Sequence, residues 1–434
     1  MSEPATRDRA ARTRALVEAG LKRRYRAERR FRMYGAAAVA IGISFVVFVF
    51  SSIIASGHSI FRQAYLHLDV EYSADVIDPA GTRHPQDLRT ADYMALVKAA
   101  MRQRFPEVEG RRNLKQLYEL VSDAAAVELR NRVMETPALI GSRTGLWVLA
   151  SDEADLVLKG RVRADQPESE RSISDQQLAW IARLQAADQL ELRFNRAFFA
   201  KGDSREPEQA GVRGAVLGSL FTLLVTLLLS FPIGVAAAVY LEEFASRNRF
   251  TDIIEVNINN LAAVPSIVFG LLGLAAFIQF FGLPRSAPLV GGLVLTLMTL
   301  PTIIIAGRAS LKAVPPSIRE AALGMGASQV QMVLHHVLPL AMPGMLTGAI
   351  IGMARALGES APLLMIGMVA FIVDLPGSLT DPATVLPVQV YIWADSPEQA
   401  FLERTSGAIL VLLAFLLVMN AAAVILRSRF ERRW

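Results

Sequence analysis

The sequence predicts an all-α membrane protein with six transmembrane helices and an α/β domain inserted between the first two. Of its 434 residues 53% are hydrophobic, and the mean hydropathy is +0.36, yet 20% are charged. Such a composition fits a folded chain only if apolar and charged residues are segregated. They are segregated here, into uncharged runs, one central polar block and two basic chain ends.

The first apolar run covers residues 35–56 and contains no charge. About 20 apolar residues cross a hydrocarbon core of about 30 Å, so this run is long enough to span it. A signal peptide is the alternative, because small residues near Ala55 and Gly57 resemble a cleavage site. The length of the run and of the basic leader, residues 1–34, favours a retained span.

Further apolar runs lie within residues 213–427, which we interpret as the membrane core. They predict five more spans, at 214–241, 261–281, 287–306, about 341–373 and 407–426.

Charge sets the expected orientation of these spans. Residues 1–34 carry 11 Lys and Arg against 4 acids, and residues 427–434 carry four Arg against one Glu. Basic ends stay in the cytoplasm, so both termini, including the tail 428–434, are expected there. The segment 374–404 holds five acids and only Arg404, as expected outside. The leader could instead grip anionic lipid, but we favour a solvated topology anchor.

The polar block, residues 57–212, carries 24 acidic and 21 basic side chains and is long enough to bury its own core. We expect it outside the membrane as an α/β domain, where it either docks a partner or braces the assembly. Its alternating or apolar stretches predict strands at 66–72, 146–151, 156–164 and 190–199. Helical spacing predicts helices at 113–132 and 174–187, the second with a Ser174–Gln177 capping box.

Several kinds of chemistry are excluded or disfavoured. The chain has no cysteine, which removes disulfides and thiolate chemistry. His58, His67 and His84 have no metal-ligand spacing, so we interpret them as ordinary histidines. None of the six lysines lies in a phosphate-binding G-x-x-x-x-G-K-[ST] loop, so no nucleotide site is expected. We predict no catalytic, cofactor-binding or metal-binding residue on this chain.

The connection at 307–341 is too short for a catalytic domain but is strongly patterned. Ser317 with Glu320 and Ser328 with Gln331 predict two capped helices. Gly324 and Gly326 separate them, and Pro339 is expected to end the second. Their apolar stripes are Ile318, Ala321, Ala322 and Met325, then Val330, Val333, Leu334, Val337 and Leu338. Such an elbow could lie in a groove of another protein or on the bilayer surface.

Two charges interrupt the fifth predicted span. Arg355 and Glu359 lie four residues apart and are expected to pair. Each costs about 2.5–3.5 kcal/mol at the centre of an isolated inserted helix, so they should face protein or water. The pair either fixes helix packing or belongs to a polar pathway, and we favour the pathway.

Prolines occur within or beside these spans. They are expected to break or kink helices and to free carbonyl groups toward an interior cavity. The residues concerned are Pro265, Pro301, Pro343 and Pro362.

The elbow resembles the EAA-x3-G-x9-I-x-LP loop of ABC importer permeases. Glu320, Ala321, Ala322 and Gly326 match its first part, and Leu338 with Pro339 its end, while His336 replaces the isoleucine. In that family the loop seats in the ATPase subunit. The resemblance therefore implies an ATPase-coupling loop at 307–341.

The last 220 or so residues resemble the PstA family of phosphate-specific permeases. The likeness lies in AVPSIVFGLLGL from Ala263, pieces of 295–328, ARALGESAPLL from Ala354 and residues 386–401. It implies a type I ABC importer permease fold in the bacterial inner membrane, and it places Arg355, Glu359 and Ser360 on the translocation pathway. Threonine is frequent in the family at the position of Ser360.

The same resemblance implies partners. These are a PstC-like second permease, a homodimeric PstB-like cytoplasmic ATPase that binds ATP and Mg, a PstS-like periplasmic phosphate-binding protein, and membrane lipid. No nucleic acid is expected.

Rival classes explain less of the sequence. A permease for another oxyanion, such as sulfate, molybdate or phosphonate, is the main alternative. A secondary transporter leaves the elbow unexplained, a sensor would need a cytoplasmic output domain, and a membrane enzyme would need a nucleophile and base or a metal cluster.

Overall fold

The computed structural model describes residues 3–162, 167–168, 171–369 and 371–430. It divides into two units, residues 1–56 and 57–434. The first unit is formed by helix α1, Glu3–Gly57. The helix is long and apolar enough over its second half to cross a membrane, which confirms a helical first span. Most of the predicted basic tail, residues 431–434, lies outside the described residues.

An antiparallel sheet forms the centre of the polar block. Strand β1 (Arg62–Glu71) lies between β2 (Arg143–Leu149) and β3 (Leu190–Phe194). The register sets Leu68 opposite Leu146 and Leu66 opposite Leu190. Alternate β1 residues are buried, as the period of two in the sequence predicts. The strands expected from 66 and from 146 are confirmed, and the one expected from 190 is correct as far as Phe194.

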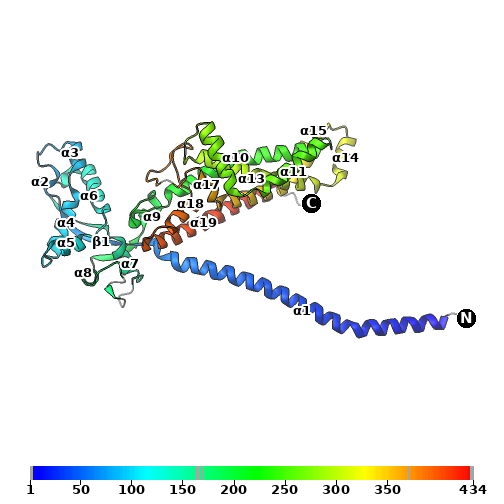
Figure 1. Ribbon diagram of the computed structural model, residues 1–434, viewed down its shortest axis with the longest axis horizontal. Coiled ribbons are helices and arrows are strands. Elements are labelled where there is room, and N and C mark those ends of the chain that lie inside the picture. The colour runs from blue at the N-terminus through cyan, green and yellow to red at the C-terminus, as the bar shows by residue number, and fades with distance from the viewer. Residues whose placement is uncertain (1–2, 163–166, 169–170, 370, 431–434) are drawn as a thin grey trace. The chain divides into compact units, whose positions relative to one another are not determined.

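Short helices lie around this sheet and, except for α9, share its apolar core, whereas Phe198 of α9 packs against Trp393 and Phe401 (Figure 1). The short helices are α2 (Ala74–Ile77), α3 (Pro85–Thr90), α4 (Tyr93–Arg104), α5 (Arg111–Tyr118), α6 (Ala124–Glu135), α7 (Asp152–Leu158), α8 (Asp175–Ala186) and α9 (Arg196–Ala200). The predicted helix at 174–187 and its capping box are confirmed.

Three expectations for this block are wrong. The stretch at 156–164 does not form a strand in its described part, residues 156–162, because residues 156–158 are the last turn of α7. The Ser151 side chain caps the first turn of that helix. Residues 163–164 lie outside the described residues. The helix at 113–132 is interrupted before α6, where Val121 pairs with Ala150. β3 stops at Phe194 because Asn195 caps α9.

Long helices form the membrane core. Helix α10 (Arg213–Val239) packs on α13 (Pro288–Lys312), which packs on α16 (Leu338–Leu357), and α16 contacts α19 (Gln399–Phe430). Figure 1 shows α10, α13 and α19 running alongside one another. Glycines permit this approach: a Cβ on Gly292 would lie 2.5 Å from Val225, and one on Gly234 would lie 2.6 Å from Ile303.

The third predicted span is not one straight helix. Helix α11 (Arg249–Ala263) and helix α12 (Ser266–Gly273), which continues as a π-helical turn Leu274–Phe280, meet at a bend of 101°. Pro265 lies at this bend, because proline has no N–H and disfavours helix in the residue before it. The described residues therefore contain five helices suited to span a membrane, or six if this bent pair counts as one.

The fifth predicted span ends early. Helix α16 stops at Leu357, with Gly358 at its C-cap, instead of continuing to 373. The short helix α17 (Ala361–Met365) follows with Pro362 in its first turn, and α18 (Leu386–Ala394) precedes α19. Proline is well tolerated in the first turn of a helix, so a new helix can start at Pro362.

Candidate coupling elbow and intramembrane charge pair

The predicted elbow exists, and it lies at one end of the core helices (Figure 1). Helix α14 (Pro316–Gly324) is followed by Gly326 at φ +85° and then by α15 (Gln329–Met332). A left-handed backbone of this kind favours glycine, which explains the residue at the turn. The two helices and the glycine between them are confirmed.

The caps of these helices differ from each other. The Ser328–Gln331 capping box is confirmed, with the Ser328 hydroxyl accepting from the Gln331 amide at 3.3 Å. The Ser317–Glu320 box is wrong, because α14 starts at Pro316 and Pro315 takes the N-cap position. Proline starts a helix without needing an N–H partner, so no side-chain cap forms.

Pro339 does not end the second helix, contrary to expectation. The chain passes from α15 through a π-helical turn, Val333–Val337, into α16, and Pro339 lies in the first turn of α16. The turn changes the register just before the proline, which then needs no i−4 partner.

The motif residues divide between the inner and the outer side of the elbow. Ala322 is buried, Leu338 and Pro339 are half-buried, and Glu320 and Ala321 are exposed. Only part of the apolar stripe predicted for the first helix of the elbow therefore faces the protein interior.

The exposed surface of the elbow is apolar at its tip. Met325 is 83% exposed, and Leu323, Val330 and Leu334 are also exposed. Adjacent exposed apolar side chains on a short, capped elbow are typical of a surface that another protein or a membrane covers.

The intramembrane charges meet as the sequence predicts. Arg355 lies in the last turn of α16, and its Nε is 3.5 Å from Oε1 of Glu359, just beyond the end of that helix. Ser360 occupies the N-cap of α17. The Arg355 side chain remains 49% exposed and that of Glu359 20%, so this chain alone does not enclose the pair.

The prolines named from the sequence have different effects. Pro301 and Pro343 lie inside α13 and α16, while Pro265 marks the 101° bend and Pro362 starts α17. The carbonyl of Pro343 accepts a hydrogen bond from the Thr347 hydroxyl at 2.8 Å. The break at Pro362 comes directly after the Arg355–Glu359 pair.

A second group of charges, at the junction between the polar block and α19, was missed. Lys159 Nζ lies 2.6 Å from Asp155 and 2.9 Å from Glu403, and all three side chains are at most 6% exposed. Next to them, Arg404 donates to Gln63 at 2.5 Å. We call Asp155, Lys159, Glu403 and Arg404 the junction cluster. The i, i+4 spacing of Asp155 and Lys159 was the sequence signal for it.

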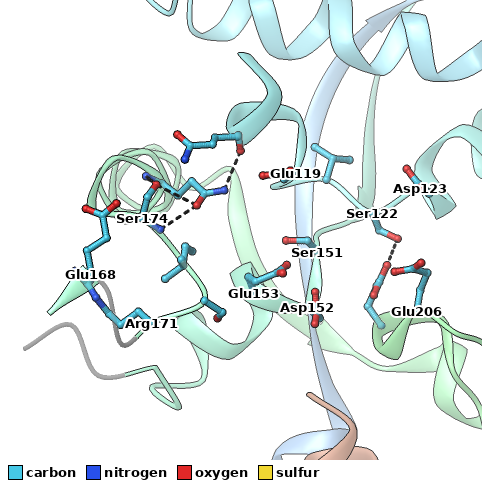
Figure 2. Close-up of a pocket in the computed structure, with 16 residues that line it drawn as sticks. Glu119, Ser122, Asp123, Ser151, Asp152, Glu153, Glu168, Arg171, Ser174 and Glu206 are labelled. Carbon is cyan, nitrogen blue, oxygen red and sulfur yellow. Dashed lines mark hydrogen bonds between the residues drawn. The ribbon is translucent and has the colours of Figure 1, made fainter. Parts of the chain in front are cut away.

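The polar block also contains an acidic cavity of about 500 Å³ (Figure 2). Ser122 donates a hydrogen bond to Glu208 at its edge. Burial raises the pKa of Glu208 to about 7, and burial together with Asp152 raises the pKa of Glu153 to about 8. The carboxyl groups that line it are Glu119, Asp123, Asp152, Glu153, Glu168, Glu206 and Glu208, against one arginine, Arg171. So many carboxylates repel anions, which makes the cavity unsuited to phosphate.

Known proteins resemble the two halves of the chain differently. Residues 230–434 match the family described as binding-protein-dependent transport system inner membrane component, and residues 18–168 match a domain of unknown function, DUF3333. The phosphate transport system permease protein PstA 1 of Mycobacterium tuberculosis is 34% identical over 52% of this chain and 74% of its own length. The probable ABC transporter permease protein YqgI of Bacillus subtilis is 31% identical over 49% of this chain and 76% of its own.

Among solved structures, the inward-facing MetNI methionine ABC transporter covers 51% of this chain and 95% of its own, with 20% identity and a TM-score of 0.41. The assignment rests on the sequence relatives. This chain is a multi-pass ABC importer permease with the type I fold. Within that class it belongs to the PstA family.

Proposed function

We propose that this chain is the membrane-spanning subunit of an ATP-driven importer that carries inorganic phosphate into the cytoplasm. The observation that carries the proposal is its likeness to phosphate transport permeases, at 34% identity over 74% of the relative's length. The Arg355–Glu359 pair supports it, because a pathway for phosphate needs a positive group within the membrane.

The proposed complex contains partners that supply what this chain lacks. They are a PstC-like second permease, a PstB-like ATPase dimer and a PstS-like periplasmic phosphate-binding protein. ATP and Mg belong to the ATPase, and this chain does not hydrolyse ATP itself. The complex lies in the bacterial inner membrane, with both termini of this chain in the cytoplasm and residues 57–212 outside.

The elbow is the proposed seat for the ATPase. Its apolar tip, with Met325 the most exposed side chain, offers the surface, and Glu320, Ala321 and Gly326 lie beside it. Closure of the ATPase dimer would displace α14 and α15 and tilt the spans attached to them. Access to the pathway would then alternate between the two sides of the membrane.

Arg355, Glu359 and Ser360 are the proposed pathway residues. Arginine forms fork-shaped hydrogen bonds to oxyanions, but an unopposed arginine inside a membrane would hold phosphate too firmly to release it. Glu359, 3.5 Å away, weakens that attraction. The Ser360 hydroxyl adds a neutral donor at the start of α17. The half-exposed side of Arg355 is where the second permease would complete the pathway.

The test is uptake of labelled phosphate at low concentration by cells with and without this chain. Unlabelled phosphate, sulfate, molybdate and phosphonate are added as competitors. Uptake that depends on the chain and is inhibited only by phosphate supports the proposal. Uptake inhibited by another oxyanion assigns that substrate instead, and uptake independent of the chain rules the proposal out.

A further inference from the structure

Two consecutive glutamates at the end of α10 bind different partners. The helix continues past Val239 as a π-helical turn, Tyr240–Phe244, which contains Glu242 and Glu243. Glu242 pairs with Arg308, at 3.3 Å, and with Lys312, at 3.6 Å, both on α13. Glu242 therefore joins one span to another.

Glu243 instead joins a span to the elbow. Arg319 of α14 donates to both carboxylate oxygens of Glu243, at 2.6 Å from Nη2 and 3.3 Å from Nε. The Glu243 side chain is 6% exposed and that of Arg319 22%. A two-pronged arginine–carboxylate pair shielded from water fixes both the distance and the angle between the groups it joins.

Further hydrogen bonds connect Glu243 to α15 and Arg319 to the end of α13. Gln329, which begins α15, donates to the backbone carbonyl of Glu243 at 2.6 Å. Arg319 also donates to the carbonyls of Leu311 and Val314 at the end of α13, at 2.9 and 2.7 Å. Glu243 is thus held from α14 through its side chain and from α15 through its backbone.

We infer that Glu243 is the positioning residue through which movement of the elbow reaches α10. The inference rests on the proposed function and adds its internal route. Because both helices of the elbow grip Glu243, displacement of either one pulls on the end of α10. Since α10 packs tightly on α13 through Gly234 and Gly292, the two spans then move together. A route of this kind needs contiguous polar and packed contacts, and these residues provide them.

The experiment measures phosphate transported per ATP hydrolysed in proteoliposomes that contain the complete complex. Glu243→Gln removes the charge but keeps the shape. We expect this ratio to fall at least about tenfold while ATP hydrolysis continues and the ATPase stays bound. Glu242→Gln is the matched control, since it weakens pairs at the same helix end that do not involve α14 or α15, and we expect less than about a twofold change.

Two further variants test the geometry. Glu243→Asp keeps the charge and should recover part of the ratio. Gln329→Ala removes only the link from α15 and should lower the ratio by about threefold.

The possible failures are distinguishable. If wild-type complex transports no phosphate, the proposed function fails. If wild type transports phosphate but Glu243→Gln and Glu242→Gln give the same ratio, the inference is overturned. Loss of the ATPase from Glu243→Gln overturns it as well, because the pair would then serve assembly and not the passage of movement.

Discussion

The junction cluster and the Arg355–Glu359 pair are two different arrangements of charge in one chain. In the cluster, Lys159 lies within 2.9 Å of two carboxylates, and the three side chains are at most 6% exposed. In the pair, the separation is 3.5 Å and Arg355 is half exposed. Buried, closely paired charges fix a structure, because removing one leaves the others without a partner. A loose, accessible pair leaves its arginine free to bind an anion.

The difference also bears on the polar block, residues 57–212. Its role, either docking a partner or bracing the assembly, was open from the sequence. The junction cluster joins α7 of the block to α19 through Lys159 and Glu403, and Trp393 of α18 donates to Asp203 at 2.9 Å. Ionic and polar bonds thus hold the block on the ends of two core helices. These contacts favour bracing, and they leave the docking of a partner to other faces of the block.

The largest expected effect is the loss of Lys159. Lys159→Ala leaves Asp155 and Glu403 buried without the lysine that contacts both of them, which should lower the free energy of unfolding by about 3–5 kcal/mol. Denaturant unfolding of the purified chain, followed by tryptophan fluorescence, measures this. Lys115→Ala breaks an exposed pair at 3.7 Å and should cost less than about 1 kcal/mol. Equal losses in the two variants would show that the junction cluster is not a clamp.

Glu208 next to the junction should make stability depend on pH. Burial raises its pKa from the ordinary 4.5 to about 7, so the folded chain keeps a proton that the unfolded chain releases. The free energy of unfolding therefore falls by about 3 kcal/mol as the pH rises from 4.5 to 7, and it stays low above pH 7.

Glu208→Gln removes this dependence. The variant should be more stable than wild type at pH 8, by up to about 3 kcal/mol, and nearly equal at pH 5, as measured by the same unfolding experiment. Glu206→Gln, at an exposed carboxyl two residues away, is the control and should change little at either pH. A Glu208→Gln effect that is the same at pH 5 and pH 8 would contradict the assignment.

A substitution at Gly326 should impair ATP-driven uptake by blocking the surface that the ATPase covers, and it should not disturb the packing of the elbow. Gly326 has φ +85°, and no atom of the described residues lies within 4 Å of the place that a Cβ would take there. A side chain at this position therefore starts out into open space. Gly326→Trp should lower ATP-driven uptake at least about 100-fold while the protein still inserts, because the indole would occupy the ATPase seat.

Gly81 provides a matched control for that variant. It also has a positive φ, +68°, and open space around it, but it lies in the polar block. Gly81→Trp carries the same backbone strain, about 1–2 kcal/mol, without touching the elbow. Uptake by the two variants is compared at equal amounts of protein in the membrane, and equal uptake would refute the coupling role.

The smallest expected effect is the change in phosphate uptake when Arg355 is replaced. Arg355→Ala should cut phosphate uptake about tenfold, equivalent to about 1.4 kcal/mol, with the complex still assembled. Lys115→Ala, which breaks a pair of similar length at 3.7 Å in the polar block, should leave uptake within about twofold. Dissociation of the Arg355→Ala complex would instead assign the pair to helix packing.

How far the sequence predicts this molecule depends on the range of the interactions. Local patterns sufficed for helix α8, for the alternating strand β1, for the capping boxes at Ser174 and Ser328, and for the Arg355–Glu359 pair four residues apart. Where a proline or glycine competes with an apolar run, hydropathy alone gave the wrong length. The end of α16 at Gly358 is such a case, whereas the bend at Pro265 confirms the break that the proline predicted.

Contacts between segments that are distant in the chain could not be predicted from the sequence. Lys159 and Glu403 are 244 residues apart, and Glu243 and Arg319 are 76 apart. No local period marks such pairs, because only the packed helices bring them together. The roles of Arg355, Glu359, Ser360 and the elbow residues stay predictions, since the fold positions them without showing a substrate or a partner.

The most direct test of the pathway is equilibrium binding of labelled phosphate to the purified complex of both permeases and the ATPase, without the binding protein. Glu359→Gln removes the charge that weakens Arg355, so this variant should bind phosphate at least about tenfold more tightly than wild type. Arg355→Ala should bind more weakly than wild type. Equal binding by all three, or equal tightening in both variants, would contradict the claim that this pair handles the anion.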